Sequence, residues 1–210
     1  MRRIQNLMEQ WLFIGPDNRQ EQVNLPHTWN AKDGQDGGND YYRGTCHYEK
    51  TFEKPEFDPK TEEVYLEFLG VNASSDVTVN GKELAHHDGG YSTFRVNITE
   101  ALQEQNKLEV TVDNSVNGKI YPQKADFTFY GGIYRDVRFL IVSKEHFDLD
   151  YLGSNGIKIT PEVKENEANV HIETFTNTEE AQVNVQIKDQ DGKVVAEGNG
   201  CDVNLNIQNP

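Results

Sequence analysis

Apolar and polar residues alternate along much of the chain, which is the pattern of β-strands buried on one face. In the segment NKLEVTVDN (106–114), Leu108, Val110 and Val112 alternate with polar residues, and the segment AQVNVQIKD (181–189) repeats this pattern. Further strands are predicted at 43–54, 62–71, 75–84, 91–99, 131–143, 156–163, 168–177, 193–198 and 202–209. The chain is therefore expected to be all-β.

Turn residues separate these strands. Asn80-Gly81 and Asp191-Gly192 suit the positive φ angles of a tight hairpin turn, type I′ at the first site, so a hairpin is predicted at each. One short helical turn is predicted at 99–105, with Thr99 as its cap and Glu100 near its N-terminus. Short strands with frequent turns are typical of a β-sandwich, and we expect a jelly roll in the first part of the chain.

The alternation lapses over residues 143–155, where polar residues cluster, so a domain boundary is predicted there. Residues 1–146 are expected to form the jelly-roll domain and residues 147–210 an immunoglobulin-like β-sandwich. An immunoglobulin-like domain has about seven strands in roughly 100 residues. The second region offers fewer strands than that, so we expect it to be incomplete, with a last strand or two beyond its C-terminus.

The composition argues against several classes of binding partner. A net charge of −15 and a pI near 4.7 argue against binding to nucleic acid or to an anionic membrane surface. No apolar stretch approaches the roughly 20 residues of a membrane span, and residues 1–15 lack a signal-peptide pattern, so a cytoplasmic location is expected. Cys46 and Cys201 are expected to be free thiols, because they fall in different predicted domains.

The chain carries no phosphate-binding glycine loop and no serine-hydrolase elbow. The adjacent pair His86-His87 points to opposite faces of a strand, so loop histidines bonded to backbone are favoured over a metal site. The many aromatic residues of 41–134 are expected mainly to fill a core, although aromatic rings also stack on sugars. Gly89-Gly90 and Gly131-Gly132 are interpreted as bulges or close backbone approaches. Arg135 and Asp136 form either an internal ion pair or two outward charges.

Several segments, taken in order, resemble the N-terminal sugar-binding domain of glycoside hydrolase family 2, the β-galactosidase and β-glucuronidase family. They are LPHTWN (25–30), YYRGTCHYEKTF (41–52), the VNGK and H-x-GGY-x-x-F motifs within 64–99, NKLEVTVDN (106–114) and DFTFYGGIYRDVRFL (126–140). The resemblance covers roughly residues 11–143. From about Ile157 the chain resembles the immunoglobulin-like second domain of the same family.

The resemblance implies that both catalytic glutamates lie in a third domain, a TIM barrel of about 250 residues, for which this chain has no room. The chain would then be a non-catalytic N-terminal fragment, inactive alone, of a retaining glycosidase, with β-galactosidase as the expected activity. Its partners would be a β-galactoside or related carbohydrate, its own downstream barrel and further copies of the protein. No cofactor is expected in the fragment, and sodium or magnesium is expected in the complete enzyme.

The same resemblance singles out three residues. Asp126 matches the aspartate that reaches the sugar and a sodium ion in β-galactosidases, so it is predicted to bind both substrate and metal. Asn39 and Asp40, in the loop before the YYRGT strand, are predicted to approach the sugar. An alternative for Asp126 is a purely structural carboxylate that accepts bonds from loop N–H groups. β-Glucuronidases place an aspartate there too, so the galactoside or glucuronide question stays open.

Two other classes of function remain. A freestanding carbohydrate-binding module would need a line of exposed aromatic residues on one sheet face. A structural or adhesive β-sandwich would usually carry a secretion signal, and none is visible.

Overall fold

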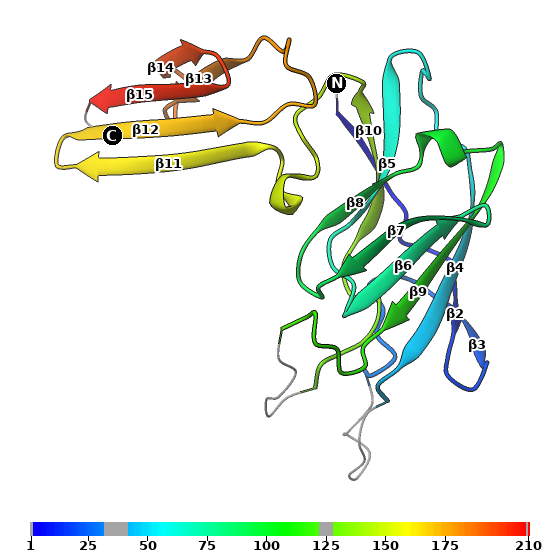
Figure 1. Ribbon diagram of the computed structural model, residues 1–210. Coiled ribbons are helices and arrows are strands. Elements are labelled where there is room, and N and C mark those ends of the chain that lie inside the picture. The colour runs from blue at the N-terminus through cyan, green and yellow to red at the C-terminus, as the bar shows by residue number, and fades with distance from the viewer. Residues whose placement is uncertain (1, 32–41, 122–127, 209) are drawn as a thin grey trace. The chain divides into compact units, whose positions relative to one another are not determined.

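The protein is an all-β chain, as predicted (Figure 1). The computed structural model describes residues 2–31, 42–121, 128–208 and 210. The chain divides into two compact units, Met1–Lys144 and Glu145–Pro210. The helices among the described residues, η1 (Thr99–Ala101) and η2 (Tyr151–Gly153), are single 3-10 turns, and no described helix is long and apolar enough to cross a membrane.

The first unit is a sandwich of two antiparallel sheets. One has the strand order β3-β2-β4-β9-β6-β7 and the other has the order β1-β10-β5-β8. The strands of the larger sheet are β3 (Gln20–Val23), β2 (Trp11–Ile14), β4 (Thr45–Glu53), β9 (Gln105–Asp113), β6 (Ser74–Val79) and β7 (Lys82–Asp88). Those of the smaller sheet are β1 (Arg3–Asn6), β10 (Val137–Ser143), β5 (Glu62–Phe68) and β8 (Phe94–Asn97).

The core lies between these sheets and is built by the period-two pattern. Leu108, Val110 and Val112 of β9 are all fully buried, which confirms the alternation read from the sequence. They pack in one apolar cluster with residues of the smaller sheet, among them Leu66 of β5 and Phe139 of β10. Burial of such a core is the main favourable term in the stability of the unit.

The hairpin predicted at Asn80-Gly81 is confirmed. Both residues have positive φ, 52° and 79°, and they join β6 to β7 with Val79 opposite Lys82. The helix cap predicted at Thr99 is wrong. No side chain caps η1, and the Thr99 hydroxyl instead accepts a bond from the Val64 N–H at 2.9 Å. The hydroxyl therefore ties η1 to β5 instead of closing a helix end.

Several strand boundaries differ from the prediction. The segment 131–143 was expected to be one strand, but β10 begins only at Val137, because residues 131–136 bond to loops instead of a neighbouring strand. The strands β1, β2 and β3 were not predicted; each has only four residues, too few for a period to be read. Short strands of this kind are recognised from their partners in the sheet.

A buried ion cluster lies on the side of the smaller sheet that faces away from the core. Glu67 of β5 is fully buried, and its carboxylate accepts bonds from Arg95 of β8 at 2.7 Å and from Arg138 of β10. Burial alone would raise the pKa of Glu67, but the bonds from the two arginines outweigh it and lower the pKa. The cluster joins three neighbouring strands of this sheet.

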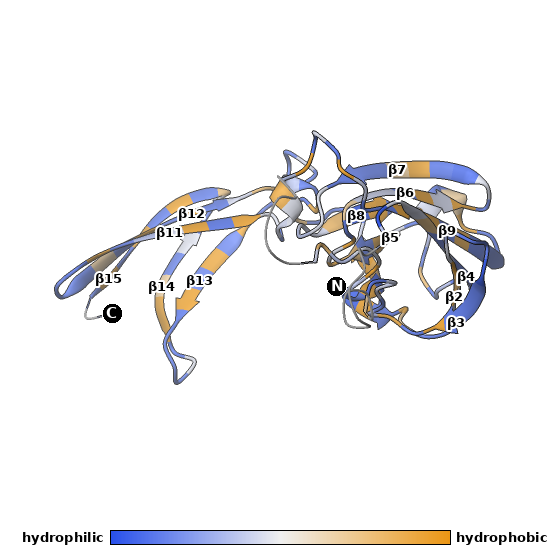
Figure 2. Cartoon of the chain, turned by 90° about the horizontal axis from the view of Figure 1, so that it is seen from below, coloured by the Kyte–Doolittle hydropathy of each residue, from blue (hydrophilic) through white to orange (hydrophobic). Residues whose placement is uncertain are grey.

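The second unit contains two smaller sheets. One has the order β11-β12-β15, formed by Ile157–Lys164, Glu167–Thr174 and Asp202–Gln208; the other pairs β13 (Asn184–Lys188) with β14 (Val194–Asn199). Gly192 has a φ of 81° in the turn between β13 and β14, which confirms the predicted hairpin. Figure 2 shows hydrophobic and hydrophilic bands along these strands. The small core lies between the two sheets.

Both cysteines are free thiols, as expected. Cys46 is fully buried within β4, and burial raises the pKa of its thiol to about 12. The thiol is therefore protonated at neutral pH and behaves as a small apolar side chain. Cys201 is exposed.

Candidate functional site

The three residues predicted to bind sugar, Asp126, Asn39 and Asp40, lie outside the described residues, in segments 122–127 and 32–41. Their roles, and the metal ligation predicted for Asp126, stay predictions. The structure does describe the residues on either side of both segments. Those flanking residues show where the two segments leave and rejoin the sandwich.

Asn30 connects the ends of the two segments. Its fully buried side chain accepts a hydrogen bond from the Gly131 N–H at 2.7 Å and donates one to the Tyr42 carbonyl at 2.9 Å. Tyr42 is the first described residue after segment 32–41, and Gly131 follows segment 122–127 by four residues. One amide group therefore holds the C-terminal flanks of both segments at the same edge of the first unit.

Asn114, directly after β9, supports the same edge. Its amide donates to the carbonyl of Phe129 at 3.2 Å and to the side-chain oxygen of Asn30 at 3.3 Å, and it accepts from the Gly44 N–H at 2.9 Å. The side chain is fully buried. The backbone at 42–44 and at 129–131 is thus fixed by two asparagines that also bond to each other.

Asn72 is the third buried asparagine at this edge. Its amide donates to the Tyr130 carbonyl at 2.6 Å and accepts from the Tyr121 hydroxyl at 2.7 Å, while its backbone exchanges two hydrogen bonds with Gly132. Burial raises the pKa of Tyr121, with a further contribution from its bond with Tyr91, so its hydroxyl stays protonated at neutral pH. Tyr121 is the last described residue before segment 122–127, so Asn72 ties the two flanks of that segment to each other.

Close backbone approach explains the glycines of this edge, as the sequence suggested. A Cβ on Gly131 would overlap the Trp29 ring, and one on Gly132 would lie 2.8 Å from the Tyr48 hydroxyl. Gly132 also has a φ of 129°, which side chains other than hydrogen disfavour. A Cβ on Gly90 would overlap the Asn72 amide. The glycines let the backbone of 131–132 pack against the sandwich.

Aromatic side chains surround the asparagines. Half of the described aromatic residues in the first unit are buried, which confirms the expected role in the core for that half, and Tyr42, Tyr91 and Tyr130 are exposed. Tyr91 is 53% exposed and stacks on Tyr121 with ring centroids 4.8 Å apart. Exposed rings held in place in this way can stack on the C–H faces of a sugar.

Arg135 bonds to the loop that carries the exposed Tyr91. Its guanidinium donates to the carbonyls of Tyr91 at 3.1 Å and of Leu69 at 3.3 Å, so it bonds to backbone, not to Asp136. The sequence left open an ion pair between Arg135 and Asp136 or two outward charges; among the described residues, the bonds of the Arg135 guanidinium go to backbone carbonyls. The role of Arg135 in the first unit is to hold the loop that carries Tyr91.

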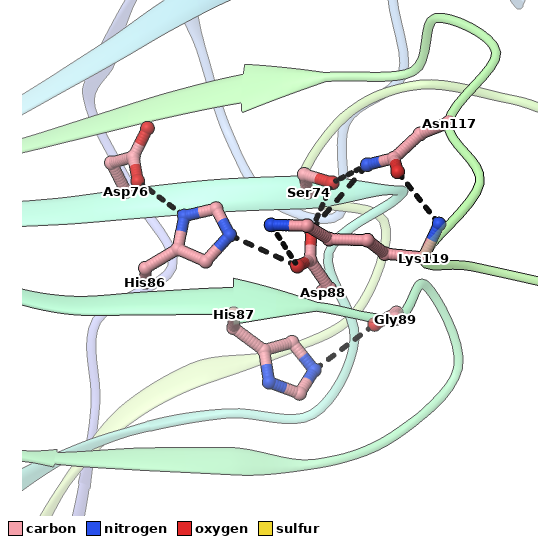
Figure 3. Close-up of polar contacts among 8 residues, drawn as sticks. All are labelled: Ser74, Asp76, His86, His87, Asp88, Gly89, Asn117 and Lys119. Atoms are coloured by element: carbon pink, nitrogen blue, oxygen red, sulfur yellow. Dashed lines mark hydrogen bonds and ion pairs between the residues drawn. The ribbon is translucent and has the colours of Figure 1, made fainter.

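A polar cluster lies on the outer face of the larger sheet (Figure 3). His86 of β7 bonds through Nδ1 to Asp76 of β6 at 2.6 Å and through Nε2 to Asp88 at 3.1 Å. Asp88 also accepts from Ser74 at 2.6 Å and lies 3.8 Å from the Lys119 ammonium. The bond to Asp76, followed by that to Asp88, raises the pKa of His86.

The two adjacent histidines belong to β7, so the expectation that they lie in a loop is wrong, but the expectation that they face opposite ways is confirmed. His87 stacks on Phe94 with ring centroids 4.2 Å apart, and its Nε2 bonds to the Gly89 carbonyl at 3.1 Å. Within the described parts of the chain, no three His, Cys, Asp or Glu residues are placed to hold a metal ion. The polar cluster is therefore an ion pair network.

The sequence did not single out Asn30, Asn72 and Asn114, which hold the backbone beside both segments. Each follows an apolar or aromatic segment, where asparagine is also a common turn residue, so sequence position did not distinguish them. Their common signal is burial, which appears only once the fold brings residues 30 and 131 together.

Residues 38–149 match the family model for the glycosyl hydrolase 2 galactose-binding domain-like family. A β-glucuronidase of Bacteroides fragilis is 43% identical over 145 residues, which are 67% of this chain and 20% of that protein. A β-galactosidase of Thermoanaerobacter pseudethanolicus is 31% identical over 161 residues, 69% of this chain and 22% of that protein. The chain therefore spans only 20–22% of the length of these two relatives.

Solved structures agree with this assignment. The FMN-binding β-glucuronidase from Facaelibacterium prausnitzii L2-6 superposes with a TM-score of 0.92 at 38% identity, covering 100% of this chain and 34% of that one. A putative β-galactosidase from Bacteroides fragilis gives a TM-score of 0.89 at 28% identity, covering 100% of this chain and 36% of that one.

Proposed function

The chain belongs to the glycosyl hydrolase 2 galactose-binding domain-like family, and we propose that it is the non-catalytic, sugar-facing part of a longer glycoside hydrolase. The observation that carries this proposal is the bonding of Asn30, which holds the flanks of both segments with predicted sugar ligands at one edge. Residues 38–149, which match the family, contain most of this edge. The proposed role is to present polar groups from that edge to a sugar bound in another domain.

The chemistry of bond cleavage belongs, in this proposal, to a barrel domain that carries two glutamates. Retaining glycosidases place two carboxyl groups about 5–5.5 Å apart, one as nucleophile and one as acid and base. No such pair is proposed in this chain. The chain contributes binding and orientation of the sugar, which lower the barrier only in combination with the catalytic groups.

For the substrate we propose a β-glucuronide, with a β-galactoside as the second candidate. Three relatives named β-glucuronidase or putative β-glucuronidase are 43%, 36% and 29% identical to the chain. The β-galactoside remains because two β-galactosidases are each 31% identical. The original expectation of a β-galactosidase therefore stays a prediction and takes second place.

The substrate is tested by comparing kcat/KM of the complete protein on 4-nitrophenyl β-glucuronide and 4-nitrophenyl β-galactoside. The proposal expects the glucuronide to be favoured by at least about tenfold, a difference of roughly 1.4 kcal/mol in transition-state binding. A higher value for the galactoside would assign the enzyme to the second candidate. Absence of turnover on both would contradict the glycosidase proposal for these substrate classes.

Asp126 is proposed as the residue of this chain that touches the sugar. In the complete protein, Asp126→Ala should lower kcat/KM by at least about tenfold, because a polar contact is worth roughly 1–3 kcal/mol. Asp191→Ala, in the exposed hairpin turn of the second unit, is the matched control and should leave kcat/KM unchanged. If Asp126→Ala lowered the melting temperature but not kcat/KM, the carboxylate would only accept hydrogen bonds from loop N–H groups and would not contact the sugar.

A freestanding carbohydrate-binding module is the rival function. It predicts aromatic rings aligned on a sheet face, but the exposed aromatic residues among the described ones, Tyr42, Tyr91, Tyr130 and Phe147, all lie outside the strands. Titration calorimetry of the 210-residue chain with millimolar glucuronides and galactosides decides between them. The rival requires a heat of binding, and the proposal expects none.

A further inference from the structure

The polar cluster on the outer face of the larger sheet includes residues of the loop that follows β9 (Figure 3). The Asn117 amide donates to the Ser74 hydroxyl at 2.9 Å, and its oxygen accepts from the backbone N–H of Lys119 at 2.8 Å. Ser74 belongs to β6, so these bonds fix the loop against that strand. The cluster therefore anchors the 114–121 loop to the sheet.

Both ends of this loop belong to the edge held by the buried asparagines. At one end, Asn114 donates to the Phe129 carbonyl at 3.2 Å. At the other end, Tyr121 donates to the side-chain oxygen of Asn72 at 2.7 Å and stacks on Tyr91 with ring centroids 4.8 Å apart. A change in the anchoring of the loop would therefore be felt at the edge of the first unit.

Asp88 connects the loop to His86. Its Oδ1 accepts from the Ser74 hydroxyl at 2.6 Å and lies 3.5 Å from the Asn117 amide nitrogen. Its Oδ2 lies 3.1 Å from Nε2 of His86 and 3.8 Å from the Lys119 ammonium. Any displacement of this carboxylate is therefore transmitted to the side chains that hold the loop.

His86 bonds to two carboxylates only in its charged form. The imidazolium donates from both ring nitrogens, to Asp76 at 2.6 Å and to Asp88 at 3.1 Å. The neutral ring keeps one N–H, and the shorter bond to Asp76 favours Nδ1 as its position. Nε2 then turns a lone pair toward the Asp88 carboxylate. Loss of the proton therefore removes the bond to Asp88 and leaves the bond to Asp76.

The charged groups on the same face as His86 come from three strands and the loop. They are Glu83 and Asp88 on β7, Asp76 on β6, Glu109 and Asp113 on β9, and Lys119 on the loop. His87 points to the opposite face, where it stacks on Phe94 of β8. The bonds to Asp76 and Asp88 raise the pKa of His86, so its proton is lost above the usual value of about 6.5.

We propose that His86 and Asp88 form a pH-dependent anchor of the 114–121 loop, which holds the loop firmly when His86 is charged and more weakly when it is neutral. The anchor is complete below the titration midpoint of His86 and is lost as pH rises through that midpoint. Its effect extends to the position of Tyr121. The inference uses contacts within the first unit alone and does not rest on the proposed function.

The Lys119 amide reports on the anchor directly, because its N–H is bonded to Asn117. NMR of the 210-residue chain gives the midpoint of the His86 ring, and hydrogen exchange is then measured one pH unit below and above it. Protection of Lys119, relative to the unstructured rate at each pH, should fall at least about threefold above the midpoint. The Ser115 amide, bonded to Asp113 at 2.7 Å, is the internal control and should keep its protection. Unchanged or increased protection of Lys119 would overturn the inference.

Two carboxylate variants test the order of the bonds. In Asp88→Asn, the His86 ring still titrates beside Asp76, but protection of Lys119 should be the same at both pH values. In Asp76→Asn, the neutral ring can keep its proton on Nε2 facing Asp88, so protection of Lys119 should stay high at both pH values. A pH dependence in Asp88→Asn equal to that of the wild type would contradict the role of Asp88.

A matched pair of histidine variants identifies the proton. His47 of β4 lies on the same outer face and bonds to Thr111 at 3.2 Å. His86→Gln should abolish the pH dependence of Lys119 protection, and His47→Gln should leave it unchanged. Loss of the dependence in His47→Gln with retention in His86→Gln would assign the proton to the wrong histidine and overturn the inference.

Discussion

At the residue scale, three buried asparagines, Asn30, Asn72 and Asn114, hold the backbone at one edge of the first unit. The side chains of Asn30 and Asn114 each bond to backbone groups of two segments distant in sequence, and that of Asn72 bonds to the Tyr130 carbonyl and the Tyr121 hydroxyl. The bond from Gly131 to Asn30 joins residues 101 positions apart. A buried amide is costly without partners and stabilising with them. The positions of the backbone segments at this edge are therefore set by neutral hydrogen bonds, which are insensitive to pH and salt.

Removal of the Asn30 amide should destabilise the first unit. Asn30→Ala leaves the Gly131 N–H and the Tyr42 carbonyl without this buried partner, and we expect a loss of about 1–3 kcal/mol in the free energy of unfolding. Asn206→Ala, an exposed asparagine in β15, is the control and should change stability by less than about 0.5 kcal/mol. Urea unfolding measures the free energy of unfolding of both variants. Equal losses in the two variants would contradict a stabilising role of the Asn30 amide.

The ion pairs of His86 predict a pH dependence of stability. The pKa of His86 is raised in the folded state, so its contribution is fully present below the unfolded pKa of about 6.5 and is lost as pH rises through the folded pKa. The pKa of Asp88 is lowered, chiefly by the Ser74 hydroxyl, so its contribution is lost as pH falls through the folded pKa. The cluster therefore stabilises most between about pH 4 and 6.5.

Thermal unfolding of the wild type and of His86→Gln over a range of pH checks the direction of this pH dependence. The melting temperature of the wild type should exceed that of the variant most at about pH 6, and the difference should shrink by pH 9. Asp76→Asn combined with His86→Gln should be less than additive, because the two residues form one pair. A difference that grew with pH would contradict the assignment.

At the scale of elements, alternation predicted strands such as β9 and β12 well, because one face of each is buried. It failed for β2, whose four residues are all apolar, and for residues 131–136, whose backbone bonds to loops instead of to a neighbouring strand. The glycines of that segment were interpreted as a bulge or a close approach, and the structure shows the close approach. Which groups they approach, the Trp29 ring for Gly131 and the Tyr48 hydroxyl for Gly132, depends on tertiary packing that no local pattern contains.

Gly131 gives an element-scale prediction. In Gly131→Ala the new Cβ would overlap the Trp29 ring, so the segment or the ring must move, at a cost of about 1–3 kcal/mol. Gly118→Ala is the control, since a Cβ there meets nothing within 4 Å. Denaturant unfolding compares the two, and a neutral Gly131→Ala would show that the packing of this segment is looser than described.

The Glu67 cluster joins β5, β8 and β10, so removal of its carboxylate is expected to lower stability by more than the substitutions above. Glu67→Ala removes the carboxylate that pairs with the buried Arg95, so we expect a loss of about 3–5 kcal/mol in the free energy of unfolding. Glu62→Ala, whose partner Arg3 is exposed, should cost less than about 1 kcal/mol. Similar losses in the two variants would contradict the difference in burial.

At the scale of the whole molecule, the sequence predicted an all-β chain, and its resemblance to a family predicted the sandwich that the structure shows. The candidate ligands Asp126, Asn39 and Asp40 came from that resemblance alone, because carboxylates and amides in loops carry no periodic signal. The flanking asparagines came from the structure alone. The asparagines hold the flanks of the two segments that contain the candidate ligands at one edge of the first unit, and this is the basis of the proposed function.

The most direct test compares turnover by the 210-residue chain and by the complete protein on 4-nitrophenyl β-glucuronide and β-galactoside under identical conditions. We predict turnover by the complete protein on at least one substrate and none above background by the chain alone, because in the proposed function the chain supplies sugar contacts and another domain supplies the catalytic pair. Turnover by the 210-residue chain at a rate comparable to that of the complete protein would contradict the central claim.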